Sequence, residues 1–154
     1  MNQIFIDFYQ KERRYNFCSS VRSEIAEHDV SLKNNGFLAF PWKRDSLSWM
    51  FKEFPDENFQ WKEDIDHSIT LVKPFNIYFV NCGNHRIACG KYFNKDGMLK
   101  CNTTIDYTNI LREYDFDGEY FIDGNKKRIN KPFHAEFVDM FILGKVIIGM
   151  QKIQ

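Results

Sequence analysis

The sequence predicts one α+β domain, in which a small mixed sheet packs with an N-terminal helix, a motif helix and a C-terminal helix. A chain of 154 residues is long enough to bury one core. Apolar residues near the N-terminus recur at helical spacing, whereas residues 66–107 hold strand-like runs around a short helical segment. Because no repeat, linker or low-complexity tract divides the chain, we expect residues 1–154 to form a single domain.

The first predicted element is an amphipathic helix within residues 4–25. Its apolar residues are three, four or seven positions apart, with charged residues between them: Ile4, Phe8, Tyr15, Cys18, Val21 and Ile25. The Asn-Asn-Gly sequence at 34–36 and Pro41 then bound a short apolar stretch. A second helix is predicted to begin near Asp45 or Ser46, because either side chain can cap it.

The central segment predicts a strand, a second strand, a helix and a third strand in succession. Residues 67–72 and 76–81 are the first two strands, and the second is nearly all apolar, which indicates a central place in the sheet. The motif helix follows at about 86–93. Residues 98–107 alternate, with the odd-numbered residues from Leu99 to Tyr107 on one face, and therefore predict one half-exposed strand.

The C-terminal third predicts a hairpin and a helix. Residues 119–122 and 126–129 are joined by Asp123, Gly124 and Asn125, and Gly and Asn tolerate the positive φ that a tight turn requires. Pro132 precedes the final element, an apolar run over residues 137–150 that indicates a buried helix.

Charge and composition restrict the possible functions. Lys and Arg total 21, as do Asp and Glu, so no overall field attracts nucleic acid or an anionic membrane. Residues 1–17 lack the uninterrupted apolar segment of a secretory signal, and residues 137–150 are too short to span a bilayer. We therefore expect a cytoplasmic protein without membrane association. The 4 cysteines lack a C-x-x-C pair and are expected to stay reduced, most of them in the core.

Gly83, Asn84, His85 and Arg86 form the turn between the apolar strand and the motif helix, and they are the main candidate site. The first amides of a helix lack intrahelical partners and carry partial positive charge, so they can bind an anion. Gly83 lets a ligand approach the backbone, Asn84 can cap the helix, and Arg86 can donate two hydrogen bonds to phosphate. His85 can bind phosphate or transfer a proton. The alternative is an ordinary strand-to-helix turn.

His67 is a second candidate acid or base, because the strand that it begins is expected to pair with residues 76–81. The alternative is a structural histidine at a sheet edge.

Residues 78–90, followed by residues 97–101, resemble the core of the ParB/sulfiredoxin-like superfamily. Its members share a strand, a Gly-x-His-Arg or similar turn, a helix and a further strand. The resemblance covers about residues 66–107. The strand over residues 66–69, together with the Gly-Asn-His turn, is also similar to small uncharacterised bacterial proteins, and that likeness implies no function.

The resemblance implies a nucleotide ligand, ATP or CTP, with its phosphates on Gly83, Asn84, His85 and Arg86. Members include CTP-dependent partition proteins, ATP-dependent sulfinic-acid reductases, free-serine kinases and proposed nucleases. The reductases need a cysteine immediately before the His-Arg pair, where this chain has Asn84. If the protein is an enzyme, we expect phosphoryl transfer, phosphoester hydrolysis or nuclease activity, with His85 or His67 as base and Arg86 stabilising charge.

A cluster of acidic residues is a candidate Mg²⁺ site. Asp115, Asp117 and Glu119 supply the hard oxygen ligands that Mg²⁺ prefers beside a nucleotide. The alternative is a set of acidic turn residues next to the hairpin.

The basic residues Lys126, Lys127 and Arg128, with Lys131, are the concentrated positive patch of the sequence and could contact nucleic-acid backbone. The alternative is a solvated hairpin, because strand edges commonly carry lysine.

Residues 37–61 hold a dense aromatic group, which would bind a protein partner if exposed and would otherwise belong to the core: Phe40, Trp42, Trp49, Phe51, Phe54, Phe59 and Trp61. This group supports a rival function, a non-enzymatic phage or mobile-element inhibitor of a bacterial defence system, or an immunity protein. The abundance of Phe, Ile, Lys and Asn, which have A/T-rich codons, fits a bacterial or phage genome.

Overall fold

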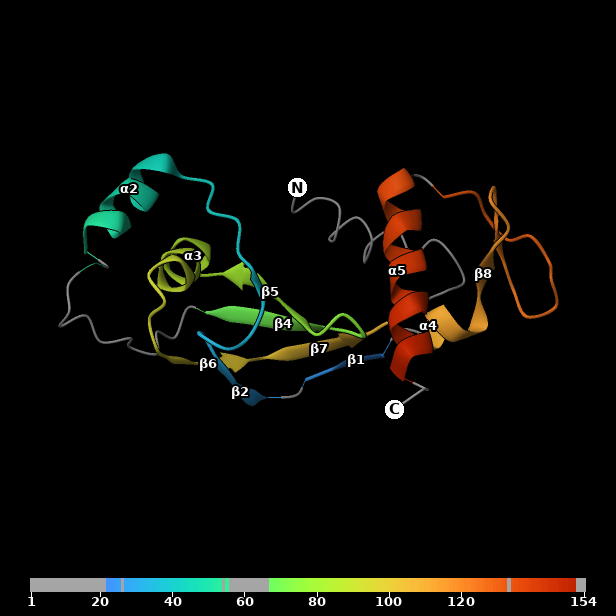
Figure 1. Ribbon diagram of the computed structural model, residues 1–154, viewed down its shortest axis with the longest axis horizontal. Coiled ribbons are helices and arrows are strands. Elements are labelled where there is room, and N and C mark those ends of the chain that lie inside the picture. The colour runs from blue at the N-terminus through green and yellow to red at the C-terminus, as the bar shows by residue number, and fades with distance from the viewer. Residues whose placement is uncertain (1–21, 26, 54, 56–66, 133, 152–154) are drawn as a thin grey trace.

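The fold is mixed helix and strand, as predicted. The structure, a computed structural model, describes residues 22–25, 27–53, 55, 67–132 and 134–151 (Figure 1). Its helices are Arg44–Glu53 (α2), Asn84–Tyr92 (α3), Thr108–Glu113 (α4) and Ala135–Gln151 (α5). Its strands are Arg22–Glu24 (β1), His28–Ser31 (β2), Phe37–Leu38 (β3), Ser68–Lys73 (β4), Ile77–Cys82 (β5), Met98–Cys101 (β6), Thr103–Asp106 (β7), Asp115–Phe116 (β8) and Phe121–Ile122 (β9).

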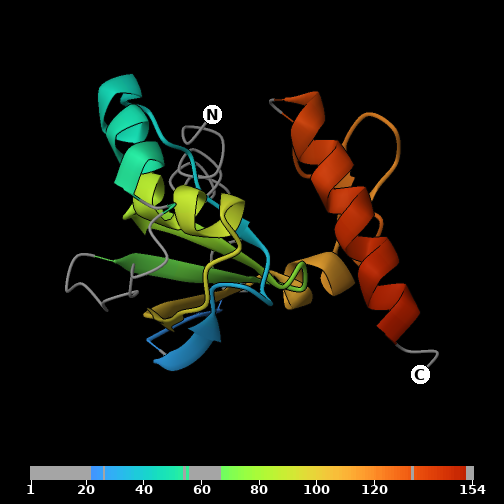
Figure 2. The same cartoon turned by 60° about the vertical axis from the view of Figure 1, so that its left-hand side comes forward.

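Five strands form the central sheet, in the order β1-β7-β4-β5-β3. The pairs β1·β7 and β4·β5 are antiparallel, whereas β4·β7 and β3·β5 are parallel. Two antiparallel ribbons, β2·β6 and β8·β9, complete the strands. Helices α2 and α3 lie together over one end of the sheet, whereas α4, α5 and the β8·β9 ribbon gather at the other end (Figures 1 and 2).

The alternation of side chains along β4 and β5 divides the core into two clusters. Ile69 pairs with Val80, and Leu71 pairs with Tyr78, so these four residues share one face. They pack with Ile87 of α3 and with apolar residues of β2 and β6, namely Val30, Leu99 and Cys101. The second cluster contains residues of the opposite face and of α4, α5 and the ribbon: Val72, Phe79, Tyr107, Ile110, Leu111, Phe121, Phe141 and Ile148.

The N-terminal prediction is wrong over residues 22–24, which form β1 instead of the end of a helix. The physical reason is long-range pairing, because Arg22, Ser23 and Glu24 align with Asp106, Ile105 and Thr104 of β7. Ile25, the last apolar residue of the predicted helix, follows β1 and is exposed, and residues 4–21 lie outside the described residues.

The single strand predicted over residues 98–107 is interrupted at Asn102. The Asn102 amide donates to the carbonyl of Ile69 at 2.9 Å, and the Asn102 side-chain oxygen accepts from the Ile69 amide at 3.0 Å. This exchange separates β6 from β7 and shifts the alternation by one residue. Leu99 and Cys101 are buried in β6, but Thr104 is the buried residue of β7, opposite to the predicted face.

The predicted hairpin is confirmed in part: three backbone bonds join its two arms, but residues 126–129 form no strand and only an isolated bridge pairs Arg128 with Ile122. Phe121 donates to Asn130 and accepts from Ile129, both at 2.8 Å, and Asp123 donates to Lys127 at 3.0 Å. The positive φ falls on Lys126, at 62°, and not on the Gly or Asn of the turn.

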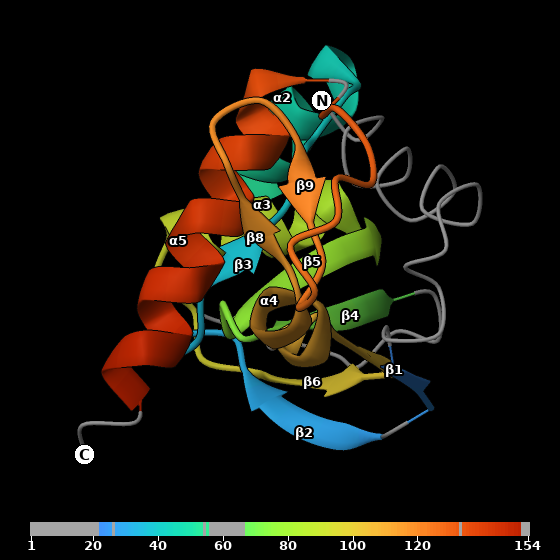
Figure 3. The ribbon, with the colours of Figure 1, turned by 90° about the vertical axis from the view of Figure 1, so that its right-hand side faces the viewer.

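The C-terminal helix is present, but the prediction that it is buried is wrong. Within the described part of the chain, one face of α5 packs, through Phe141, Gly144 and Ile148. A Cβ at Gly144 would lie 2.6 Å from a methyl carbon of Leu111, so glycine permits the close approach of α5 to α4. The other face exposes apolar side chains, because α5 stands beside α4 and the ribbon at the end of the molecule (Figure 3): Ile142, Leu143, Val146 and Met150. Among the described residues, no helix combines the length and apolar character of a bilayer-spanning segment.

Candidate functional site

The candidate site is the turn where β5 leads into α3. Gly83 has a φ of 87°, a left-handed conformation that glycine adopts without steric penalty. Its carbonyl accepts the first helical hydrogen bond, from the Ile87 amide at 3.0 Å. Gly83 is therefore the N-cap residue, and no side chain of the described residues caps the helix. The prediction that Asn84 caps α3 is wrong, because Asn84 is the first helical residue and its side-chain oxygen has another partner.

The structure brings His67 against this turn. A Cβ added to Gly83 would lie 2.1 Å from His67 Cδ2 and 2.9 Å from Nε2, so the imidazole ring occupies the space that a side chain would need. A glycine is therefore required at position 83 for two reasons: the positive φ of the backbone and the close approach of the His67 ring. His67 therefore lies beside the motif, a proximity that the sequence alone left open.

Asn84 is almost fully buried, with 1% of its surface exposed. Its Oδ1 accepts a hydrogen bond from the Phe40 amide at 2.7 Å, which joins α3 to the loop after β3. Its Nδ2 has no hydrogen-bond partner within the described part of the chain. A buried donor without an acceptor is unfavourable by roughly 1–3 kcal/mol, so this amide is a candidate ligand-binding group.

His85 holds the same loop at a second point. Its Nε2 lies 2.9 Å from the backbone nitrogen and 3.1 Å from the carbonyl oxygen of Lys43. The ring accepts from the amide when Nε2 is unprotonated and donates to the carbonyl when Nε2 carries the proton, so both tautomers keep this contact. The Trp42 and His85 rings meet edge to face, with centroids 4.8 Å apart and planes at 65°.

Arg86 completes the turn as a half-buried residue in the first turn of α3. Lys91, near the other end of the helix, donates to the carbonyls of Lys33 and Asn35 at 3.0 and 2.9 Å. Side chains thus fasten α3 at both ends to the segments before and after β3. The start of the helix is consequently held in one orientation, which is what an anion site on its amides requires.

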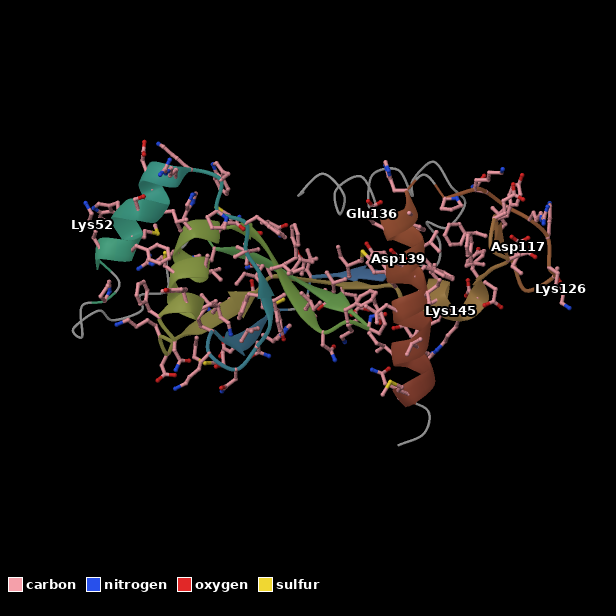
Figure 4. All side chains as sticks on the ribbon, turned by 45° about the horizontal axis from the view of Figure 1, so that its top comes forward. Lys52, Asp117, Lys126, Glu136, Asp139 and Lys145 are labelled. Atoms are coloured by element: carbon pink, nitrogen blue, oxygen red, sulfur yellow. The ribbon has the colours of Figure 1, made fainter. Side chains whose placement is uncertain are left out.

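The acidic residues predicted to bind Mg²⁺ are not brought to this turn. Figure 4 places Asp117 at the opposite end of the molecule from α3. Each of the three carboxylates instead pairs with a cation, Asp115 with Lys145, Asp117 with Arg128 and Glu119 with Lys131. Within the described ranges, no group of three His, Cys, Asp or Glu side chains is arranged to hold a metal ion.

Asp117 organises the turn between β8 and β9. Its Oδ1 accepts from the amides of Tyr120 and Glu119 at 2.7 and 2.9 Å. These backbone hydrogen bonds, and then the contact with Arg128, hold the pKa of the Asp117 carboxyl below its ordinary value. The hydrogen bond from Lys131 to Glu119 correspondingly raises the pKa of Lys131. These interactions support the structural interpretation of the acidic cluster.

The basic patch is partly neutralised by the same contacts. Arg128 and Lys131 both lie over the ring of Tyr120, at 4.6 and 4.9 Å from its centroid, while they pair with Asp117 and Glu119. Lys126 and Lys127 remain exposed. Arg128 and Lys131, two of the four predicted nucleic-acid contacts, therefore already form ion pairs within the hairpin region.

The aromatic group of residues 37–61 is divided between core and surface. Phe40 packs near Phe79, with centroids 6.2 Å apart. Trp42, Trp49 and Phe51 are 70%, 59% and 37% exposed. Phe54, Phe59 and Trp61 lie outside the described residues.

Tyr92 of α3 adds to the surface part and was not predicted from the sequence. It is 71% exposed, and its ring centroid lies 5.0 Å from that of Phe51. The helical spacing of the apolar residues around Tyr92 does not indicate that its side chain faces outward beside α2. We call Trp42, Trp49, Phe51 and Tyr92 the exposed aromatic residues.

The fold and the turn define a small protein of mixed helix and strand with one candidate anion-binding corner. A family model matches residues 2–154, and the chain therefore belongs to DUF6710, a family of unknown function. No curated protein and no solved structure matches the chain.

Proposed function

We propose that this protein binds the phosphate groups of a nucleotide, ATP or CTP, at the start of α3. The observation that carries the proposal is the Asn84 side chain, whose buried Nδ2 lacks an acceptor among the described residues. It belongs to the first turn of a helix, where the backbone amides also lack intrahelical acceptors. A phosphate oxygen would supply acceptors to these donors, and the helix dipole would favour its charge.

The order of elements supports a ParB/sulfiredoxin-like core as part of this proposal. Strand β5, the Gly83–Arg86 turn, helix α3 and strand β6 follow one another as the resemblance implies. Catalysis at this corner, if it occurs, would be phosphoryl transfer or phosphoester hydrolysis. His67 or His85 would act as base and Arg86 would stabilise developing charge. Any Mg²⁺ would accompany the nucleotide, because the acidic cluster lies at the far end of the molecule.

A thermal-shift measurement with ATP and CTP, with and without Mg²⁺, tests the proposal on wild type, Arg86→Ala and Arg112→Ala. A ligand at about 100 times its Kd adds roughly 2.7 kcal/mol of stability, which raises the Tm of a chain of this size by about 5–10 °C. We expect this shift in wild type, its loss in Arg86→Ala and its retention in Arg112→Ala. Arg112 is the matched control, because it is an exposed arginine of α4. An undiminished shift in Arg86→Ala, or no shift with either nucleotide, would contradict the proposal.

The exposed aromatic residues favour a second candidate function, a non-enzymatic protein-binding factor such as an anti-defence inhibitor or an immunity protein. Exposed Trp and Tyr side chains are enriched at the centres of protein interfaces. Three of the four residues come from α2 and α3, which pack together at one end of the molecule (Figure 1). A stoichiometric partner retained by Arg86→Ala but lost by Trp49→Ala and Tyr92→Ala would support this function. Equal retention by all three variants would contradict it.

A further inference from the structure

Trp42 is an exposed aromatic residue next to the α3 turn. It is 70% exposed, although burial of an aromatic ring is strongly favourable. Its ring nevertheless has a defined place, 4.8 Å from the His85 ring by centroids. A large ring that is held in position and yet open to solvent is suited to contact a ligand.

The motif itself holds the loop that carries Trp42. Asn84 binds the Phe40 amide at 2.7 Å on one side of Trp42, and His85 binds the Lys43 backbone at 2.9 Å on the other. Pro41 lies between the first contact and Trp42, and its ring restricts the backbone there. Two of the four turn residues therefore fix the loop on both sides of the indole.

We propose that Trp42 is the stacking platform for the base of the nucleotide whose phosphates bind at the start of α3. This inference rests on the proposed function and specifies its ligand class. A nucleotide joins a flat aromatic base to a phosphate chain, and the structure places an open indole beside a helix N-terminus. Stacking tolerates any base, because every base has a π-face. The site therefore prefers a nucleotide over inorganic polyphosphate and discriminates weakly between ATP and CTP.

Calorimetric titration with ATP, CTP and inorganic tripolyphosphate tests this inference. Base stacking on an aromatic side chain corresponds to roughly 5- to 150-fold in affinity. We expect wild type to bind both nucleotides more tightly than tripolyphosphate by a factor in this range. Trp42→Ala should lose that advantage while it keeps its affinity for tripolyphosphate, and Trp42→Phe should retain part of it. Trp49→Ala is the matched control, because Trp49 is a similarly exposed tryptophan of α2, and should behave as wild type.

The outcomes separate the two proposals. Equal binding of ATP and tripolyphosphate by wild type would overturn the stacking inference and leave the phosphate site standing. Equal loss of both ligands in Trp42→Ala would also overturn it, because the loop would then act only as a clasp for α3. Binding of neither ligand by wild type would overturn the stacking inference and the proposed function together.

Discussion

Substitution of Gly83 by alanine perturbs the candidate site at its tightest point. Two effects add. The positive φ of 87° becomes strained for a residue with a Cβ, by roughly 1–2 kcal/mol. The new Cβ would also lie 2.1 Å from His67 Cδ2, and such overpacking typically costs about 1–3 kcal/mol. We therefore expect Gly83→Ala to lower the free energy of unfolding by about 2–5 kcal/mol.

Urea denaturation measures this loss, provided that the m-value stays constant between variants. Gly118→Ala is the matched control. Gly118 also has a positive φ, 99°, but an added Cβ would meet no atom within 4 Å. This variant should lose only the strain, about 1–2 kcal/mol. The difference between the two variants isolates the contact with His67.

A double variant completes the cycle. His67→Ala removes the ring, so Gly83→Ala in that background should lose no more stability than Gly118→Ala does in wild type. Equal losses in Gly83→Ala and Gly118→Ala would refute the packing of His67 on the turn. An undiminished loss in the His67→Ala background would refute it as well.

Two further predictions concern titration and reactivity. The folded-state pKa of Asp117 is lowered, so the stability that it contributes is present above the ordinary carboxyl pKa and is lost as the pH falls through the folded-state pKa. NMR titration should give a pKa below about 3.9 for Asp117. Asp117→Asn should remove this part of the loss of stability in acid. Burial raises the pKa of the Cys89 and Cys101 thiols, whereas Cys82 is exposed. Iodoacetamide at pH 8 should therefore modify Cys82 in the native protein much faster than Cys89 or Cys101, as peptide mass spectrometry would show, and equal rates would contradict the burial.

Local patterns predicted the central elements well. The predicted strands 67–72 and 76–81 and the helix 86–93 agree with β4, β5 and α3 to within two residues at each end. Such elements are readable because hydrophobic periodicity and turn residues act over short distances along the chain. The same reasoning located Gly83–Arg86 between a strand and a helix.

Long-range hydrogen bonds explain the two wrong predictions of secondary structure, at residues 22–24 and at Asn102. Residues 22–24 became a strand because β7 offers them an edge, and Asn102 interrupted a strand because its side chain bonds to Ile69. Neither partner can be inferred from the spacing of apolar residues. The exposure of one face of α5 likewise depends on which elements surround that helix.

The sequence by itself determined that an apolar strand runs through a Gly-Asn-His-Arg turn into a helix, because those residue types dictate the local backbone. Tertiary structure alone decided what surrounds that turn. Packing brings the His67 ring against Gly83 and the Trp42 ring against that of His85. It also lets the Asn84 side-chain oxygen accept a hydrogen bond from the Phe40 amide. It also carried the acidic cluster to the far end of the molecule, where each carboxylate found a cation. These contacts join residues up to 44 positions apart, so only the pairing of strands and the packing of helices could bring them together.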